Sequence, residues 1–252
     1  MIEFTCADHI AVATLAQPAR GNALSESMVE SLIDRVTECI ADDSIHTLVL
    51  NSTGSHFCTG FDLGNQTAEP RAAGDSQAAA DGPLLWRFAR IEHLLTLIWN
   101  APLRTVAVAR GRTWGAGADL FVACDLRYAD SQTEWRFPGA GFGLVLGTRR
   151  LSSVVGPDKA LNWVAHGCRI ETSEALASGL ATAQLSDPMI ASDGWRTQLP
   201  ALAVDRSTYA QLKAATRPDQ SNDDLAALVR SGALPGLAER LQAYRNNSKP
   251  RK

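Results

Sequence analysis

Two glycine-rich stretches carry the residue types that could do chemistry in this sequence. The stretch FCTGFDLG, residues 57–64, follows the apolar run TLVLN, and GRTWGAGADLFVACD, residues 111–125, follows RTVAVAR. Glycines permit close backbone approach and unusual dihedral angles. The helix predicted after the second turn leaves its first amides without intrahelical partners. If the two turns meet, their amides form an oxyanion hole, which stabilises a carbonyl that gains negative charge, as in enolate formation.

Asp119 is the acid in the second stretch, directly before the apolar run Leu120–Cys124. Burial beside that run would raise its pKa into a range useful for acid–base catalysis. The alternative is structural, because an acid in the first turn of a helix interacts favourably with the helix dipole, by about 0.3–1 kcal/mol. Asp119 is the candidate catalytic acid.

Other chemistries find less support in the residues. Gly115, Ala116 and Gly117 follow a predicted strand as in a dinucleotide-binding fingerprint, but Leu120 stands where the third glycine is needed. The sequence has no Walker motif and no G-x-S-x-G nucleophile turn. Its five cysteines are widely spaced and form no CxxC pair, so neither a metal site nor a disulfide framework is predicted: Cys6, Cys39, Cys58, Cys124 and Cys168.

Apolar periodicity supplies the elements that must position these residues. Strands are predicted at residues 9–16, 47–51, 104–110 and 126–130, and helices at 27–41, 84–100, 157–167 and 172–179. Ser27 and Glu30 form a capping-box pattern at the start of the first helix. Residues 65–82 have no apolar period and are predicted to be a loop, and the chain turns helical and polar beyond about residue 190. The alternation predicts an α/β layer followed by a helical appendage.

Composition bounds the class of protein. The 252 residues are 45% hydrophobic and 20% charged, with a formal net charge of −3. This balance does not indicate a nucleic-acid or membrane-surface binder, and we interpret the basic tail SKPRK as a solvated terminus. No apolar run approaches the roughly 20 residues that span a bilayer, and the first residues do not resemble a signal peptide. We expect a cytoplasmic protein.

Four segments, in order and in register, resemble the crotonase (enoyl-CoA hydratase/isomerase) superfamily. They are QPARGNALSESMVESLIDRV, FCTGFDL, VARGRTWGAGADLFVACDLRYAD and PDKALNWVAHGCRIETSEALASGLATAQL. The resemblance runs from about residue 9 to residue 185. It implies a spiral of ββα units with an acyl-CoA site over residues 1–190, and a C-terminal helical oligomerisation region over 191–252. It also implies a homotrimer or a dimer of trimers.

Carried onto this chain, the resemblance gives each site residue a role. The oxyanion donors are the backbone amides of Phe61 and Ala116, and Arg20 is a candidate phosphate partner. Trp114 and Trp135 would flank the acyl pocket, and Asp62 has a competing interpretation as a turn or cap residue. The full set of predicted substrate-binding residues is Arg20, Asn22, Cys58, Gly60, Asp62, Leu63, Gly115, Trp114, Trp135 and Gly139.

The acids are where this sequence departs from the superfamily pattern. Hydratases of the family use two glutamates, which correspond here to Asp119 and to Gly139, the residue after Pro138. Glu134 is a candidate substitute for the missing acid. Adding water across a double bond is a natural task for two acids. A single acid suffices for moving a double bond, although the isomerases of the family usually keep theirs at the position of Gly139.

The resemblance implies an enzyme of acyl-CoA thioesters, of the kind found in fatty acid metabolism, that hydrates or isomerises an enoyl-CoA through a bound enolate. Coenzyme A enters as part of the substrate, and no other cofactor is expected. Two alternatives stay open: another thioester reaction, such as hydrolysis, dehalogenation or decarboxylation, or an acyl-CoA-binding paralogue with weakened catalysis.

Overall fold

A six-stranded sheet is the frame of the molecule in the computed structural model, which describes residues 1–64, 77–186, 189–190 and 193–247. The strand order is β1-β2-β3-β4-β6-β9, antiparallel between β1 and β2 and parallel elsewhere. The strands are β1 (Ile2–Ala7), β2 (Ile10–Leu15), β3 (Thr47–Ser52), β4 (Arg104–Ala109), β6 (Leu126–Ala129) and β9 (Ala183–Gln184). The predicted strands are confirmed, whereas β1 is a mostly exposed edge strand that the apolar pattern missed.

Helices and the small second sheet carry the turns of interest. Every residue of β3 and β4 is buried, as expected for parallel strands covered on both faces. The three-stranded sheet β5-β7-β8 stands beside α3 (Ala116–Ala123), so its strands hold the turn that precedes this helix. Its strands are β5 (Arg112–Trp114), β7 (Glu134–Arg136) and β8 (Ile170–Glu171).

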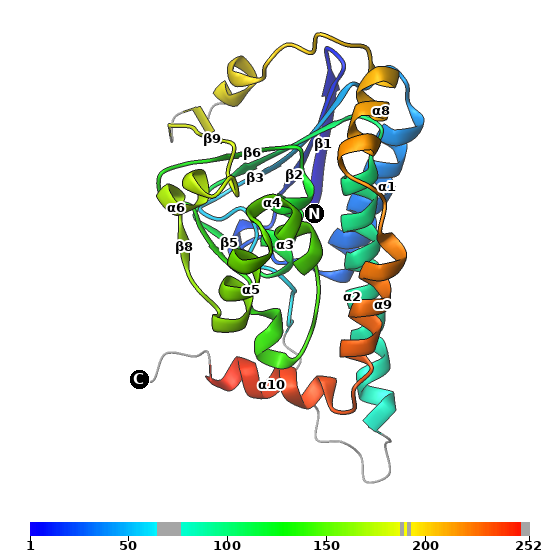
Figure 1. The fold of residues 1–252 in the computed structure, drawn as a ribbon, viewed down its shortest axis with the longest axis vertical. Helices are drawn as coiled ribbons and strands as arrows, with labels where there is room; N and C mark the ends of the chain where they lie inside the picture. Colours follow the sequence, from blue (N-terminus) through cyan, green and yellow to red (C-terminus); the bar gives the residue numbers. More distant parts are fainter. Residues whose placement is uncertain (65–76, 187–188, 191–192, 248–252) are drawn as a thin grey trace.

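The first long helix, α1 (Glu26–Ala41), begins differently from the prediction. The Ser25 hydroxyl accepts a hydrogen bond from the Met28 amide at 3.2 Å, so Ser25 is the N-cap and the capping box at Ser27 was wrong. Glu30 instead forms an ion pair with Arg90, with 2.7 Å between Oε1 and Nε. This pair ties α1 to α2 (Gln77–Asn100), which packs beside it (Figure 1).

The prediction of a loop over residues 65–82 was wrong for its last six residues. Residues 65–76 lie outside the described residues, but 77–82 belong to α2. The run Gln-Ala-Ala-Ala has high helix propensity, and the Asp81 carboxylate accepts hydrogen bonds from the amides of Gly236 and Ala238, both at 2.8 Å. Tertiary contact with the last helix therefore favours helix in a stretch without an apolar period.

The helical C-terminal region is confirmed. Helix α8 (Arg206–Thr216) is tied to the sheet by the buried Lys213, whose Nζ lies 3.0 Å from Oδ2 of Asp125. Helix α9 (Ser221–Gly232) packs along α2, and α10 (Leu237–Asn247) crosses its lower end (Figure 1). The division of the chain near residue 190 stays a prediction.

Shorter helices connect these elements. The α-helices are α4 (Thr148–Val155), α5 (Pro157–His166) and α6 (Thr172–Ala177), and the 3₁₀ turns are η1 (Pro18–Arg20), η2 (Pro138–Phe142) and η3 (Gly194–Gln198). Helices α5 and α6 were predicted; α4 was not.

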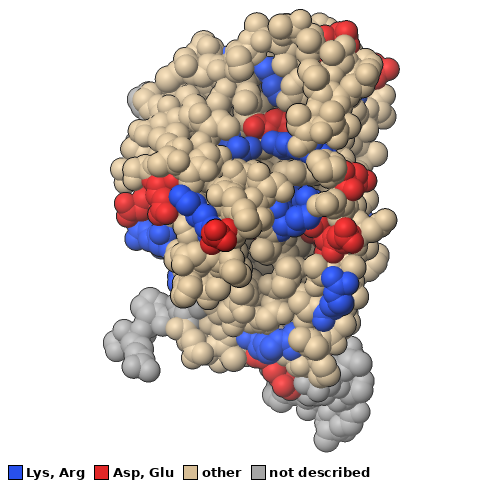
Figure 2. All heavy atoms as spheres, in the orientation of Figure 1, with Lys and Arg blue, Asp and Glu red and all other residues tan. Residues whose placement is uncertain are grey.

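Basic and acidic side chains alternate over the face shown in Figure 2. No helix in the described ranges has the length and apolar character needed to cross a membrane. The same residues contain no group of three or more His, Cys, Asp or Glu side chains placed to hold a metal ion.

Candidate active site

The two glycine-rich turns meet. Gly60 has φ +96° and Gly115 has φ +53°, so both use the left-handed region that favours glycine. A Cβ on Gly60 would lie 2.7 Å from the Trp114 carbonyl oxygen and 3.5 Å from the Ala116 nitrogen. The turns therefore approach each other at a distance that only glycine at position 60 allows, which brings the amides of Phe61 and Ala116 to one place.

Both amides are available to a ligand. The segment around Phe61 is fixed by hydrogen bonds from Leu24 N to Gly60 O (2.8 Å) and from Asp62 N to Leu24 O (3.1 Å), and the second turn by one from Gly115 N to Arg136 O (2.8 Å). Within the described residues, neither the Phe61 nor the Ala116 amide donates a hydrogen bond. Ala116 opens α3, where the first amides lack intrahelical partners. Two free donors held by rigid neighbours form a candidate oxyanion hole.

Cys58 packs against both glycine-rich turns. It is fully buried, its Sγ accepts a hydrogen bond from Gly60 N at 3.4 Å, and burial raises the pKa of its thiol to about 12. A Cβ on Gly117 would lie 2.4 Å from the Cys58 carbonyl oxygen, so α3 is packed directly on the first turn. Cys58 thus acts through packing, as a neutral thiol.

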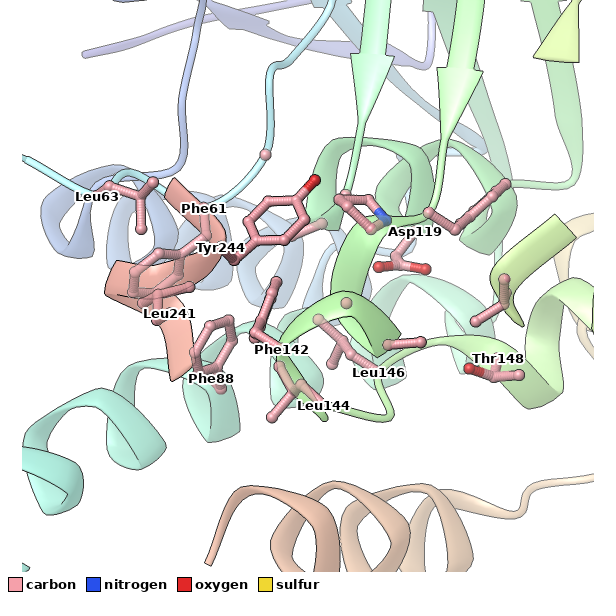
Figure 3. Close-up of a pocket in the computed structure, with 18 of the residues that line it drawn as sticks. Phe61, Leu63, Phe88, Asp119, Phe142, Leu144, Leu146, Thr148, Leu241 and Tyr244 are labelled. Carbon is pink, nitrogen blue, oxygen red and sulfur yellow. The ribbon is translucent and has the colours of Figure 1, made fainter. Parts of the chain in front are cut away.

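The amides face a largely apolar pocket with an empty volume of about 760 Å³, including open space at its mouth. Asp119 is the one acidic residue among the described residues that line the pocket. None of these lining residues is a lysine, an arginine or a histidine. Figure 3 shows the Asp119 carboxylate pointing toward the centre of the pocket. The lining is Thr59, Gly60, Phe61, Leu63, Phe88, Gly115, Ala116, Asp119, Phe137, Pro138, Gly139, Ala140, Phe142, Leu144, Leu146, Thr148, Val164, Leu241 and Tyr244.

Asp119 lies in α3, one turn after the Ala116 amide, and is 6% exposed. Its Oδ1 has no hydrogen-bond partner in the described part of the chain. Burial raises the pKa of this carboxyl well above its usual value; Glu92 adds to the rise and Arg150 opposes it. A Cβ on Gly147 would lie 2.2 Å from Oδ1, so the backbone before α4 presses on the carboxylate. These features make Asp119 a candidate for proton transfer.

The comparisons with known proteins agree with this geometry. The sequence profile of the enoyl-CoA hydratase/isomerase family matches residues 5–231. The chain belongs to the crotonase (enoyl-CoA hydratase/isomerase) superfamily.

Individual relatives cover most of the chain. The Mycobacterium bovis protein named "Probable enoyl-CoA hydratase echA6" is 31% identical over 208 residues, 81% of this chain and 77% of its own length. An ethylmalonyl-CoA decarboxylase of Gallus gallus is 31% identical over 180 residues, 70% of this chain and 57% of its own. A Bordetella parapertussis crystal structure assigned to the enoyl-CoA hydratase/isomerase family superposes with a TM-score of 0.85 at 34% identity, covering 99% of both chains. These similarities also identify the observed architecture as the crotonase fold.

Gly139, the residue that the resemblance aligns with the second acid of the superfamily, is part of the pocket wall. Gly139 follows Pro138 at the start of η2 and lines the pocket; a Cβ there would lie 3.1 Å from the Leu144 carbonyl oxygen. Glu134, the candidate substitute, does not line the pocket, and its carboxylate pairs with Arg169 at 2.6 Å. Neither position supplies a second acid.

The residues predicted to bind coenzyme A frame the first turn. Arg20 is half exposed and pairs with Asp62 at 2.9 Å. Asp62 Oδ1 also accepts a hydrogen bond from Gly64 N at 2.8 Å, which supports its interpretation as a turn residue. Arg87 donates to the Asp62 carbonyl at 2.8 Å and lies 4.1 Å over the ring of Phe61. The pocket mouth therefore has basic side chains nearby, although none lines the pocket itself.

Asn22 holds that loop in place. It is fully buried at φ +54°, its Nδ2 donates to the carbonyls of Thr53 (2.9 Å) and His56 (2.8 Å), and its Oδ1 accepts from Gln17 N (2.8 Å). Every polar atom of the side chain is used inside the protein, so any contact of Asn22 with a ligand falls to its backbone.

Trp114 and Trp135 do not line the pocket. Trp135 is fully buried and packs on Phe121 with ring centroids 5.2 Å apart, and the Trp114 ring lies under the Arg112 guanidinium at 4.8 Å. The expectation that both rings flank the acyl group is corrected by these packing contacts. His56 and His93 also lie outside the lining; His56 Nδ1 accepts from the Arg112 amide at 3.2 Å.

The acyl side of the pocket was missed by sequence reasoning. Its aromatic wall runs from Phe61 to Phe88 (4.4 Å between centroids), Phe142 (6.2 Å from Phe88) and Tyr244 (5.5 Å from Phe142). Figure 3 shows Leu241 and Tyr244 reaching the pocket from α10. In the sequence Phe88 and Tyr244 are ordinary apolar positions of helices, and Phe142 lies in the glycine-rich stretch 138–147; of the four, Phe61 alone was predicted as a site residue.

Proposed function

We propose that this protein isomerises or otherwise transfers a proton on enoyl-CoA thioesters, with the thioester oxygen held by the Phe61 and Ala116 amides. The observation that carries the proposal is the place of Asp119, alone as an acid in an apolar pocket and one helical turn from a free amide. Coenzyme A is proposed to enter only as part of the substrate. The two amides stabilise the negative charge of the enolate oxygen.

The single acid favours double-bond migration over hydration. The Asp119 carboxylate removes a proton from the carbon next to the conjugated system, the electron pair moves into the enolate, and the same carboxyl group returns the proton at the other end. One group can do both because burial raises the pKa of Asp119, which makes its carboxylate a stronger base and lets the same group return the proton as a carboxylic acid. Hydration would require the pocket to position water without a second carboxylate.

Replacing Asp119 by Asn tests the assignment. We expect Asp119→Asn to lower kcat on an accepted enoyl-CoA by about 100-fold or more, with thioester binding retained, measured by mass spectrometry and calorimetry. Glu134→Gln is the matched control, because it removes a carboxylate outside the pocket and should leave turnover unchanged. Full activity of Asp119→Asn, or tight binding of many acyl-CoA thioesters without any turnover, would refute the proposal; the second result would indicate the weakened paralogue.

Decarboxylation is a second candidate, favoured by the apolar surroundings of Asp119. A 2-carboxyacyl-CoA that loses CO₂ leaves its bonding electrons as an enolate on the two amides, and the neutral Asp119 carboxyl group then protonates the α-carbon. A relative is named ethylmalonyl-CoA decarboxylase. In deuterated water, this reaction would release CO₂ and place one deuterium on the α-carbon, whereas isomerisation releases none.

The homotrimer or dimer of trimers and the cytoplasmic location rest on the superfamily resemblance and the composition. They remain predictions, and light scattering of the purified chain measures the first.

A further inference from the structure

A fully buried ion pair lies behind the pocket. Glu92 of α2 and Arg150 of α4 are 2% and 1% exposed, and their contact is two-fold, with Nη2–Oε1 at 2.6 Å and Nη1–Oε2 at 3.1 Å. The Thr96 hydroxyl donates to Glu92 Oε1 at 3.2 Å and accepts from Arg150 Nη2 at 3.0 Å. Burying such a pair is costly unless its hydrogen bonds are satisfied, and here the terminal nitrogens of Arg150 are held by named partners.

The charges around this pair balance. Asp224 of α9 lies 3.1 Å from Arg150 Nη2, and Arg149 binds the Asp224 carboxylate through two hydrogen bonds of 2.7 and 2.6 Å. Glu92 and Asp224 thus neutralise Arg149 and Arg150. Removing the charge of Glu92 would leave one uncompensated cation beside α3.

Asp119 is the acid next to this cluster. Helices α2 and α4 both pack against α3, and Gly147, which presses on Asp119 Oδ1, directly precedes α4. In the described residues, Asp119 Oδ1 and Arg150 Nε are both buried polar atoms without a hydrogen-bond partner. The Arg150 guanidinium group therefore binds Glu92, and the Asp119 carboxyl group has no ion pair with it.

We propose that Glu92 is a positioning residue that holds the Arg150 guanidinium away from Asp119, so that the Asp119 carboxyl group is left without an ion pair and can both take up and release a proton. This inference rests on the proposed role of Asp119. A group that first removes a proton and then returns it must pass between its charged and neutral forms, whereas an Asp119–Arg150 ion pair would fix the carboxylate in its charged form.

Two arginines on strands beside α3 have partners other than Asp119. Arg112 of β5 lies over Trp114, and Arg104 of β4 donates to Thr47 Oγ1 and to the Pro200 carbonyl. Burial is the largest cause of the raised pKa of Asp119, Glu92 is the next, and Arg150 is the one opposing charge. Loss of Glu92 thus acts twice in the same direction, by removing an anion and by freeing a cation.

The test is the titration of Asp119 itself. An infrared difference band of the protonated carboxyl group, absent from Asp119→Asn, follows its ionisation without any substrate. In Glu92→Gln we expect the pKa of Asp119 to fall by about 1 unit or more, and the limb of the kcat–pH profile that belongs to Asp119 to move equally. Glu92→Asp keeps the charge and should stay close to the wild type.

The double variant Glu92→Gln, Arg150→Met separates pairing from general disturbance. With no cation to reach Asp119, its pKa should return to or above the wild-type value, as it should in Arg150→Met alone. An unchanged titration in Glu92→Gln, or a low pKa that persists without Arg150, overturns the inference. If the titrations behave as expected but Asp119→Asn retains full turnover, the positioning stands and the proposed function fails.

Discussion

At the scale of single residues, the chemistry depends on where one carboxyl group is held. Asp119 has no hydrogen bond at Oδ1 in the described part of the chain, so packing fixes its position, and the backbone at Gly147 leaves no room for a side chain beside it. Gly147 has φ +67° and is the N-cap residue of α4.

Gly147→Ala should therefore displace the acid. The added Cβ would lie 2.2 Å from Oδ1 and 2.6 Å from Cγ of Asp119, so the side chain must move by about 1 Å, a shift that can cost about 100-fold in rate. We expect kcat to fall by that order while thioester affinity, measured by calorimetry, changes little.

Gly156→Ala is the matched control for this prediction. Gly156 is also an N-cap with positive φ, +87°, but a Cβ there would meet no atom within 4 Å. The Gly156→Ala variant introduces backbone strain but no contact with Asp119. It should therefore lower the free energy of unfolding and leave kcat unchanged. Equal losses of kcat in the two variants would contradict the steric explanation.

At the scale of elements, the oxyanion hole is a product of two turns and the segments that hold them. The turn at 57–64 rests on the loop that Asn22 fastens, since Thr59 N donates to Gly21 O at 3.0 Å. The side chain of Asn22 thus connects the loop before α1 to the segment after β3.

Asn22→Ala should loosen this connection. It leaves the buried carbonyls of Thr53 and His56 without their side-chain donor, at a cost of about 1–3 kcal/mol each, and adds strain at φ +54°. Urea unfolding should show a loss of at least about 2 kcal/mol together with weaker acyl-CoA binding. Asn100→Ala, which removes an exposed amide bonded to Asp219, should lower the free energy of unfolding by less. An equal loss would argue against a special role of the Asn22 hydrogen bonds.

The sequence was informative where local pattern and tertiary structure agree. Buried parallel strands such as β3 and β4 are continuous apolar runs, and the two glycine turns are marked by residue type, so the core strands, Phe61, Ala116 and Asp119 could be found. The start of α2 at Gln77 and the packing of Trp135 could not, because each is decided by contacts between segments that are separated in the sequence. The Ser25 cap is a local contact with Met28 and was missed because Ser25 and Ser27 both precede the apolar run. The aromatic wall shares this limit, since Phe88 and Tyr244 meet only through folding.

At the scale of the whole molecule, ionisation of the buried Asp119 carboxyl group lowers the stability of the fold. Its folded pKa is raised above the unfolded value, so between about pH 4 and the folded pKa the unfolded chain binds fewer protons at this site than the native protein. Stability then falls as pH rises through that window.

This sign gives a measurable slope. The free energy of unfolding of wild type minus that of Asp119→Asn should decrease as pH rises from 4 to 7. Asp205→Asn is the opposite control, since hydrogen bonds from Thr208 hold the pKa of Asp205 below its usual value; its difference should rise with pH only below about pH 4 and stay flat from pH 4 to 7. A flat difference for Asp119→Asn would show that the carboxyl group ionises alike in both states.

Helix α10 completes the pocket wall and, of the described helices, is the last to be synthesised. Both amide donors and Asp119 precede residue 120, whereas Leu241 and Tyr244 close the pocket from residues 237–247. During synthesis the reacting groups leave the ribosome long before this wall does, so the nascent chain acquires the complete acyl site only when its last helix docks. A cut before Leu237 would remove Leu241 and Tyr244 from the pocket wall while leaving Phe61, Ala116 and Asp119 in the protein.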